Sequence, residues 1–360
     1  MADLMAVRPK QRISPDEALQ LFRTADLMTL GHMAEHVKAR FHAADAPYTF
    51  VIDRNVNYTN VCNVDCAFCA FYRHADHPEA YTLDYPQIKA KAEELVAIGG
   101  TQLLLQGGVN PKIPFEAYLD MLRQLRRDFP RLTLHAFSPT EISFMVQLTG
   151  KPLRWVLQQL IDAGMSSLPG AGGEILHDEI RRKVSPKKVA VEDWMAVMAT
   201  AHELGLKTSS TMMFGMMESD WHLVDHLFRI RAQQDATGGF LSFIPWSFQK
   251  PHTKLERRPE PMATGLEYLK VSALARIVLD NVPHIGASWI TQGLKIGQTA
   301  LMMGANDLGG IMMEENVVTH AGIHPTTKTI DEMIKTIHFA GRDAAQRDTD
   351  YSLVKHYPYA

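Results

Sequence analysis

The chain has 360 residues, of which 46% are hydrophobic and 21% are charged, a balance that supports a large core and argues against a disordered protein. The formal net charge of −3 is spread along the chain without a basic stripe, which argues against a nucleic-acid partner. The N-terminal residues lack the apolar core of a signal peptide and no run reaches the roughly 18 apolar residues of a membrane helix, so we expect a soluble, cytoplasmic protein without a membrane partner.

Two helices are expected before the first strand. The segment Ser14-Pro15-Asp16-Glu17 has the spacing of a capping box, with proline at the first helical position, and this pattern predicts the start of a helix. A second helix is predicted over about 26–43. Together they predict an N-terminal helical extension over residues 1–46.

Short β-rich runs then alternate with amphipathic helical stretches, such as the one in which Ile330, Met333, Ile334 and Ile337 share a face. The predicted strands are 48–57, 101–106, 132–137, 165–168, 206–214, 240–246, 284–289 and a weaker one near 310–313. Eight such units predict the α/β class and a (β/α)8 TIM-type barrel over residues 47–345, followed by a C-terminal tail over 346–360. Six units with appended elements are the alternative, and in both cases the chemistry belongs at the C-terminal ends of the strands.

The three cysteines of the chain, Cys62, Cys66 and Cys69, stand in a C-x3-C-x2-C spacing directly after the first predicted strand. An odd, clustered set cannot form a disulfide framework and indicates reduced thiols that bind metal. Thiolates at these intervals can hold three irons of a 4Fe–4S cluster. Because no fourth cysteine exists, one iron is left open and can chelate the amino and carboxylate groups of S-adenosylmethionine. The alternative is a structural zinc site with His74 or His77 as the fourth ligand.

Two glycine-containing turns are candidate cofactor sites. Gln106, Gly107 and Gly108 end the second predicted strand, where glycines let the backbone approach a ligand closely; an ordinary strand-to-loop turn is the alternative. Residues 168–176 follow the fourth strand and include Glu174, which could accept hydrogen bonds from ribose hydroxyls. One of the two arginines in the helix that follows could pair with a carboxylate, and a capped helix with solvated charges is the alternative.

Further polar groups follow the third and sixth strands. His135 and Glu141 are candidate bases, although the favoured description of His135 taken alone is a structural, partly buried histidine. The segment 245–254 combines aromatic rings with hydrogen-bonding groups, and its candidate substrate contacts are Trp246, Gln249 and Thr253. Tryptophan at a strand end commonly belongs to the core instead. The other histidines are interpreted as structural or surface residues.

The run Asp53-Arg54-Asn55-Val56-Asn57-Tyr58-Thr59-Asn60-Val61-Cys62, continued by Cys69-Ala70-Phe71-Tyr72-Arg73, resembles radical S-adenosylmethionine enzymes of the menaquinone and deazaflavin pathways. Within that group the chain is most similar to cyclic dehypoxanthine futalosine synthases. The segments 105–109, 135–141, 168–176, 243–254 and 304–310 support the resemblance, which spans about residues 48–330.

The resemblance implies that Cys62, Cys66 and Cys69 ligate a 4Fe–4S cluster whose open iron binds S-adenosylmethionine. The residues that it implies in cofactor binding are Phe68, Gln106, Gly107, Gly108, Ser138, Glu174, Arg182 and Gly215. The last of these lies in Thr211-x-Met213-x-Gly215-x-x-Glu218, which loosely resembles the adenine-contacting G-x-I-x-G-x-x-E motif of related enzymes. Thr211 replaces the first glycine of that motif, which puts the individual adenine contact in doubt.

The resemblance further implies a reaction of menaquinone biosynthesis. Dehypoxanthine futalosine loses hydrogen from C4′ of its ribose to a 5′-deoxyadenosyl radical, and the carbon radical attacks the benzoate ring. Loss of an electron and a proton then restores aromaticity. An electron donor such as flavodoxin or ferredoxin is implied, whereas the base that takes the ring proton is not identified. The alternatives are an aminofutalosine synthase, a deazaflavin (FO) synthase subunit and, from another class, a non-catalytic iron–sulfur or zinc-binding protein.

Overall fold

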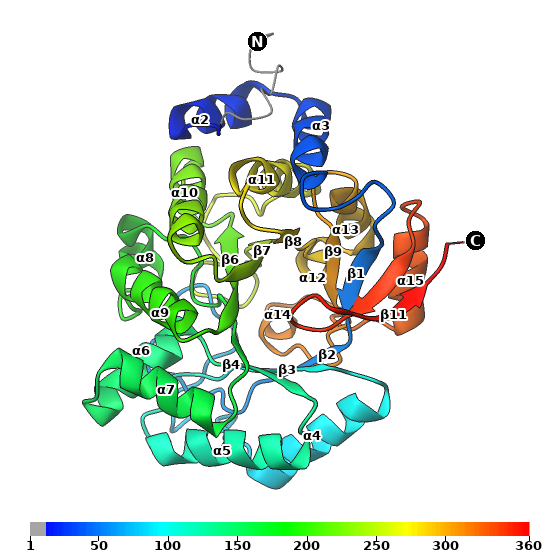
Figure 1. Cartoon of the computed structure of the whole chain (residues 1–360). Helices are drawn as coiled ribbons and strands as arrows, with labels where there is room; N and C mark the ends of the chain where they lie inside the picture. Colours follow the sequence, from blue (N-terminus) through cyan, green and yellow to red (C-terminus); the bar gives the residue numbers. More distant parts are fainter. Residues whose placement is uncertain (1–11, 360) are drawn as a thin grey trace.

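The computed structural model describes residues 12–359, so the first eleven residues of the predicted extension and the last residue of the predicted tail lie outside the described part. Helices α2 (Pro15–Thr24) and α3 (Leu27–Lys38) follow the predicted pattern. The Ser14 hydroxyl accepts a hydrogen bond from the Glu17 N–H at 3.3 Å, and the Glu17 carboxylate accepts one from the Ser14 N–H at 2.8 Å. This capping box fixes the start of α2. Both helices lie outside the barrel, against α10 (Asp220–Thr237) and α11 (Gly265–Val278) (Figure 1).

The centre of the molecule is a seven-stranded parallel sheet in sequence order. Its strands are β2 (Asp53–Val56), β3 (Gln102–Leu105), β4 (Thr133–Ala136), β5 (Ser167–Leu168), β6 (Lys207–Phe214), β7 (Phe240–Ser247) and β8 (His284–Ile285). Strand β9 (Asp307–Gly310) joins β8 through the Gly286–Asp307 bridge and pairs in parallel with β1 (Tyr48–Val51), which continues into β2. Hydrogen bonding therefore runs around eight strand positions, which confirms the predicted (β/α)8 TIM-type barrel.

Helices cover the outside of the sheet (Figure 1). Besides α10 and α11 they are α4 (Tyr85–Ala97), α5 (Phe115–Asp128), α6 (Pro139–Thr149), α7 (Leu153–Ala163), α8 (Asp178–Val184), α9 (Val191–Glu203), α13 (Leu294–Leu301) and α15 (Ile330–His338). Two short helices, α12 (Trp289–Gln292) and α14 (Val317–His320), contribute residues to the cavity described below. The predicted apolar face of α15 is used as expected, because Met333 and Ile337 are fully buried. One extensive core cluster joins these helices to the outward-facing residues of the strands.

The predicted strand 48–57 is two strands in two sheets. Strand β1 pairs with β10 (Ala344–Arg347) and β9, whereas β2 pairs with β3. The last barrel strand lies three residues before its predicted position, and left-handed backbone at Met312 (φ 52°) follows its end.

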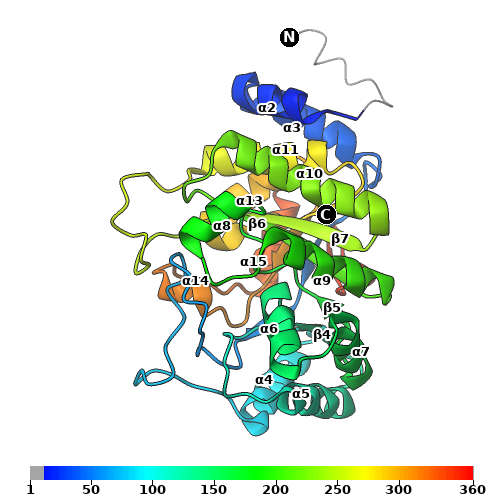
Figure 2. The same cartoon turned by 90° about the vertical axis from the view of Figure 1, so that its left-hand side faces the viewer.

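A C-terminal hairpin closes the N-terminal end of the barrel. Strand β10 crosses the predicted division between residues 345 and 346, and β11 (Leu353–Tyr357) pairs with it in antiparallel; the domain division itself stays a prediction. The Arg347 guanidinium pairs with both carboxylate oxygens of Asp307 at 2.5 and 2.9 Å. The Thr349 hydroxyl donates to Gln102 at 2.8 Å, and the Tyr351 ring stacks on His284 at a centroid distance of 3.5 Å. The opposite end of the barrel carries the long loops after β2 and β7 together with α14 (Figure 2). Among the helices of residues 12–359, none is long and apolar enough to cross a membrane.

Candidate active site in the barrel

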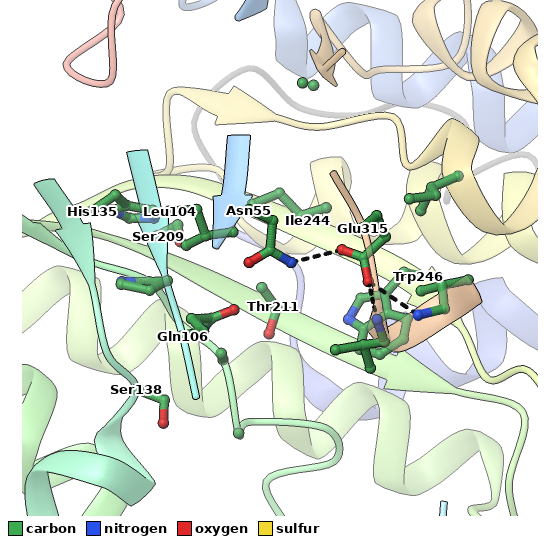
Figure 3. Close-up of a pocket in the computed structure, with 18 of the residues that line it drawn as sticks. Asn55, Leu104, Gln106, His135, Ser138, Ser209, Thr211, Ile244, Trp246 and Glu315 are labelled. Atoms are coloured by element: carbon green, nitrogen blue, oxygen red, sulfur yellow. Dashed lines mark hydrogen bonds between the residues drawn. The ribbon is translucent and has the colours of Figure 1, made fainter. Parts of the chain in front are cut away.

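Polar side chains line the interior of the barrel, where an ordinary barrel of this type is packed with branched aliphatic residues. Asn55, His135, Ser167, Ser209 and Ser242, from five different strands, all line one cavity of about 440 Å³. Several of these side chains are seen together in Figure 3. The cysteines line the same cavity, as do the closing residues Arg347 and Tyr351. The cavity therefore runs from the cysteine loop into the interior and can hold an organic molecule next to the cysteines.

The cysteine loop is held by its backbone. The Cys62 N–H donates to the Arg73 carbonyl at 3.0 Å, the Cys69 N–H donates to the Cys66 carbonyl at 3.2 Å, and the Ala67 N–H donates to the Val184 carbonyl at 2.7 Å. Burial raises the pKa of the Cys66 thiol to about 12 and also raises the pKa of Cys69. Such thiols lose their protons when a metal binds them, so metal loading stabilises the loop in its ionised form.

The spacing of the sulfur atoms fits a cluster better than a single zinc ion. Among residues 12–359, the three cysteine sulfurs do not all lie within 4.8 Å of one another. Zinc–sulfur bonds of about 2.3 Å in a tetrahedron would hold the sulfurs about 3.8 Å apart. The proposed zinc ligand His74 is exposed, and His77 accepts a hydrogen bond from the Glu79 N–H on its Nδ1 at 3.1 Å. The three thiols thus do not stand at the spacing of a single zinc ion, and three cysteine ligands suit a cubane with one open corner.

A second cluster of possible metal ligands lies outside this cavity. His177, Glu179 and His222 bring their ligand atoms within 4.8 Å of one another, a group that was not predicted from the sequence. The Ser219 N–H donates to His222 Nδ1 at 3.0 Å, so the neutral ring keeps its proton on Nε2 and has no lone pair to offer there. The contacts of His222 are those of a helix cap.

The turn after β3 packs directly on the cysteine loop. A side chain at Gly108 would place its Cβ 2.2 Å from the Val61 carbonyl oxygen and 2.8 Å from Cβ of Cys62. A Cβ at Gly107 would lie 2.6 Å from the Tyr58 ring. Both positions therefore require glycine because of the close approach. Gln106, Gly107 and Gly108 all line the cavity, where the sequence predicts cofactor contacts.

Glu141 ties this turn to the first turn of α6. Its Oε1 accepts hydrogen bonds from the Tyr58 hydroxyl at 2.5 Å and the Gly107 N–H at 3.1 Å, and its Oε2 accepts one from the Ser138 hydroxyl at 2.6 Å. Burial raises the pKa of Glu141 to about 7. Three donors already occupy the carboxyl group, so its contacts are those of a positioning residue; a role as a base stays a prediction.

The glycine-rich segment after β5 places a buried ion pair at the cavity. Glu174 Oε1 accepts a hydrogen bond from Lys188 at 2.7 Å, whereas its Oε2 is buried without a hydrogen-bond partner within residues 12–359. Arg181 lies 3.6 Å from that oxygen, but Arg182, the predicted residue, is exposed on α8. The helical phase thus brings the neighbouring arginine inward. The hydroxyl of Thr140, which also lines the cavity, is a second buried group that finds no hydrogen-bond partner in the described part of the chain. Unpaired polar atoms beside a lysine fit a ligand with hydroxyl and carboxylate groups, as S-adenosylmethionine has.

His135 lies deeper in the cavity, in contact with Ser167. The Ser167 hydroxyl donates to the Lys207 carbonyl at 2.7 Å, so it accepts the hydrogen bond from His135 Nδ1 at 2.9 Å. This leaves Nε2 as the nitrogen with a free lone pair. Burial lowers the pKa of His135 to about 3, so the ring is neutral at neutral pH.

The remaining predicted site residues divide into two groups. Phe68 and Trp246 line the cavity. Gln249, Thr253 and Gly215 do not. Gln249 donates to the Ser247 carbonyl at 3.1 Å, Thr253 donates to the Lys250 carbonyl at 2.7 Å, and the Gly215 N–H donates to Glu218. The structure thus gives these three residues local contacts, and their predicted roles stay predictions.

Among the cavity residues missed from the sequence are Asn55, Lys188, Glu315 and Arg347. The position of Asn55 could have been predicted from the sequence. It is one of several polar residues that alternate along a buried strand, and residues i and i+2 of a strand point to the same face. The other three lie in loops or beyond the predicted barrel, where no periodic pattern indicates direction.

Comparisons with known proteins agree with this geometry. Residues 56–230 match the radical SAM superfamily and residues 237–358 match the CofH/MqnC C-terminal region. The chain is 38% identical to the cyclic dehypoxanthine futalosine synthase of Halalkalibacterium halodurans, over 96% of this chain and 92% of that protein. It is 40% identical to the synthase of the same name from Streptomyces coelicolor, over 96% and 86%. It is also 38% identical to the aminodeoxyfutalosine synthase of Thermus thermophilus, over 96% and 93%.

The solved structure of methylornithine synthase has the same fold, with a TM-score of 0.74, 14% identity and coverage of 96% of this chain and 97% of that one. Radical SAM enzymes use a 4Fe–4S cluster and S-adenosylmethionine, and these are the cofactors of this enzyme. The chain therefore belongs to the radical SAM superfamily, in the family that includes the cyclic dehypoxanthine futalosine synthases and the aminodeoxyfutalosine synthases.

Proposed function

We propose that the enzyme converts dehypoxanthine futalosine into cyclic dehypoxanthine futalosine in menaquinone biosynthesis. The proposal is supported by its similarity to two synthases of that name. The observation that carries it is the cavity of about 440 Å³, lined by both apolar and polar side chains, that continues from the cysteine loop into the barrel. A substrate that joins a ribose with its hydroxyl groups to an aromatic acid needs such a mixed lining.

Cys62, Cys66 and Cys69 would hold the cluster, and the turn at residues 106–108, Ser138, Glu174 and Lys188 would surround S-adenosylmethionine. When bound, these cofactors supply a 5′-deoxyadenosyl radical, which removes the C4′ hydrogen of the substrate as 5′-deoxyadenosine. The C4′ radical would form a bond to the benzoate ring, and transfer of one electron to the oxidised 4Fe–4S cluster and of one proton to a base would restore aromaticity. The cofactors carry the reactive chemistry, so the protein's task is to hold one C–H bond in place and exclude water. The closed N-terminal end of the barrel, where Arg347 pairs with Asp307, serves that exclusion.

A low-potential donor, flavodoxin or ferredoxin, would supply the electron. The surface next to the cysteine loop carries the exposed lysines Lys187 and Lys254, which lie 3.1 and 3.7 Å from the two carboxylate oxygens of Asp65, the residue before Cys66. Two cations on one carboxylate leave a local positive charge, which complements an acidic redox protein. A cytoplasmic location and the absence of a nucleic-acid partner belong to the same proposal.

A substrate panel tests the assignment. The reduced enzyme with S-adenosylmethionine is incubated separately with dehypoxanthine futalosine and with the substrates of aminodeoxyfutalosine synthase and FO synthase. The expected result is 5′-deoxyadenosine and a cyclised product with dehypoxanthine futalosine alone. The similarity to the Thermus thermophilus synthase makes aminodeoxyfutalosine synthase the main alternative. Product formed only with the substrate of that enzyme would overturn the assignment and leave the family membership intact.

A further inference from the structure

Glu315 occupies a buried position at the wall of the cavity, in the segment that follows β9. It is 8% exposed. Its Oε1 accepts hydrogen bonds from the Val317 N–H at 2.7 Å and the Val318 N–H at 3.0 Å. Its Oε2 accepts a hydrogen bond from the side-chain amide of Asn55 at 2.8 Å. All three partners are N–H donors, so the carboxylate acts only as an acceptor.

This contact fixes the direction of the Asn55 amide. An amide that donates to Glu315 through Nδ2 must turn Oδ1 the other way, and a flipped amide would bring two acceptors together. Figure 3 shows the amide nitrogen turned toward Glu315 and the oxygen turned away from it, on the side of Gln106 and Thr211. Asn55 is 3% exposed, and its Oδ1 has no hydrogen-bond donor within residues 12–359. Such an acceptor is unfavourable until a donor reaches it.

The surroundings of Asn55 indicate what kind of donor this is. Asn55 lines the cavity together with the hydroxyls of Ser209 and Thr211 and with the apolar surfaces of Ile244 and Trp246 (Figure 3). Hydroxyls on one side and a large ring on the other suit a sugar that is joined to an aromatic group. A carboxylate cannot satisfy Asn55 Oδ1, because both groups are acceptors.

We propose that Asn55, oriented by Glu315, accepts a hydrogen bond from a ribose hydroxyl of the substrate and so fixes the sugar for removal of its C4′ hydrogen. The inference rests on the proposed function and adds a specificity-determining residue, Asn55, and a positioning residue, Glu315. The benzoate carboxylate then lies elsewhere in the cavity. Glu315 acts only through Asn55 and touches no reacting atom.

Binding measurements with substrate analogues test the inference. The affinities of dehypoxanthine futalosine and of its 2′-deoxy and 3′-deoxy analogues are measured by calorimetry with the oxidised, cluster-loaded enzyme and S-adenosylmethionine, so that no turnover occurs. The wild-type enzyme is expected to bind one deoxy analogue about tenfold more weakly than the substrate. Asn55→Leu is expected to bind the substrate and that analogue equally. Glu315→Gln replaces one acceptor oxygen by an N–H₂ group, which then faces the N–H donors of Asn55 or of residues 317 and 318. The amide of Asn55 thereby loses its fixed direction, and the difference in affinity between the substrate and the deoxy analogue is expected to shrink.

The matched control is Asn281→Leu. Asn281 also has a buried side-chain oxygen without a partner within residues 12–359, but it does not line the cavity. Its variant is expected to keep the wild-type discrimination. Iron content and melting temperature are recorded for each variant, and Glu315→Gln, which conserves shape, keeps the test valid if Asn55→Leu does not fold. Retention of the full discrimination in Asn55→Leu, or in Glu315→Gln alone if the first does not fold, would overturn the inference. Turnover of dehypoxanthine futalosine by the wild-type enzyme tests the proposed function separately.

Discussion

A single methyl group at Gly108 should separate the cofactor turn from the cysteine loop. In Gly108→Ala the new Cβ would lie 2.2 Å from the Val61 carbonyl oxygen, 2.7 Å from its carbon and 2.8 Å from Cβ of Cys62. Ordinary contacts need about 3.4 Å or more, and two of these atoms are backbone, so the two segments must move apart by about 1 Å. That movement breaks the hydrogen bond from the Gly108 N–H to the Thr59 carbonyl, which is now 2.9 Å long.

The cost follows from two contributions. Overpacking of a tight contact costs about 1–3 kcal/mol. The turn and the loop are joined by the Gly108–Thr59 hydrogen bond and by a second one from the Asn63 N–H to the Val109 carbonyl at 3.0 Å, and each contributes about 0.5–1.5 kcal/mol. The sum is roughly 2–6 kcal/mol, which for a chain of this length lowers the melting temperature by roughly 3–8 °C.

The assay combines stability with cofactor loading. Gly108→Ala and wild-type protein are reconstituted anaerobically, and iron, sulfide, melting temperature and formation of 5′-deoxyadenosine are measured. We expect a lower melting temperature, incomplete iron and a loss of 5′-deoxyadenosine formation, because Cys62 no longer aligns with the other two cysteines. The control is Gly31→Ala in α3, whose Cβ would meet only the flexible Met303 side chain at 3.3 Å. A Gly108→Ala enzyme with wild-type iron content and activity would refute the reasoning.

Three further results are expected. Cys66→Ala should abolish cleavage of S-adenosylmethionine while circular dichroism shows a folded barrel, and appreciable turnover would count against the cluster assignment. His135 takes up a proton below pH 6.5 in the unfolded chain but only near pH 3 in the folded chain, so it lowers the free energy of unfolding by about 1.4 kcal/mol for each pH unit below 6.5. The melting temperature of His135→Gln should therefore fall less than that of the wild type between pH 7.5 and 5.5. Equal falls in the two proteins would contradict the burial argument. Reversal of charge in the double variant Lys187→Glu/Lys254→Glu should slow cluster reduction by flavodoxin and weaken its binding, but leave reduction by dithionite unchanged; an equal effect of Lys295→Glu, an exposed lysine of α13, would argue against a specific docking surface.

The predictions that the structure and the comparisons confirmed came from local sequence patterns. The capping box at Ser14, the alternating units of the barrel and the cysteine spacing each depend on residues that are close in sequence, so their physical meaning is readable without the fold. The close approach at Gly107 and Gly108 is likewise a property of the residue type, whereas the cofactor contact predicted for this turn stays a prediction.

Long-range contacts and side-chain direction account for what was missed. Glu315 meets Asn55 across 260 positions of sequence, and the guanidinium of Arg347 enters the barrel from a segment predicted as a tail. The choice between Arg181 and Arg182 depends on where α8 begins, since one residue turns a helical side chain by about 100°. The rotation of α8 about its axis is set by the conformation of the glycine-rich segment before it, and composition and spacing do not determine that conformation.

The most direct test of the account follows the hydrogen at C4′. The reduced, cluster-loaded enzyme is incubated with S-adenosylmethionine and dehypoxanthine futalosine that carries deuterium at C4′, and 5′-deoxyadenosine is analysed by mass spectrometry. The account predicts one deuterium in 5′-deoxyadenosine and none at that carbon in the cyclic product. Cyclic product with unlabelled 5′-deoxyadenosine, or no cleavage of S-adenosylmethionine at all, would contradict it.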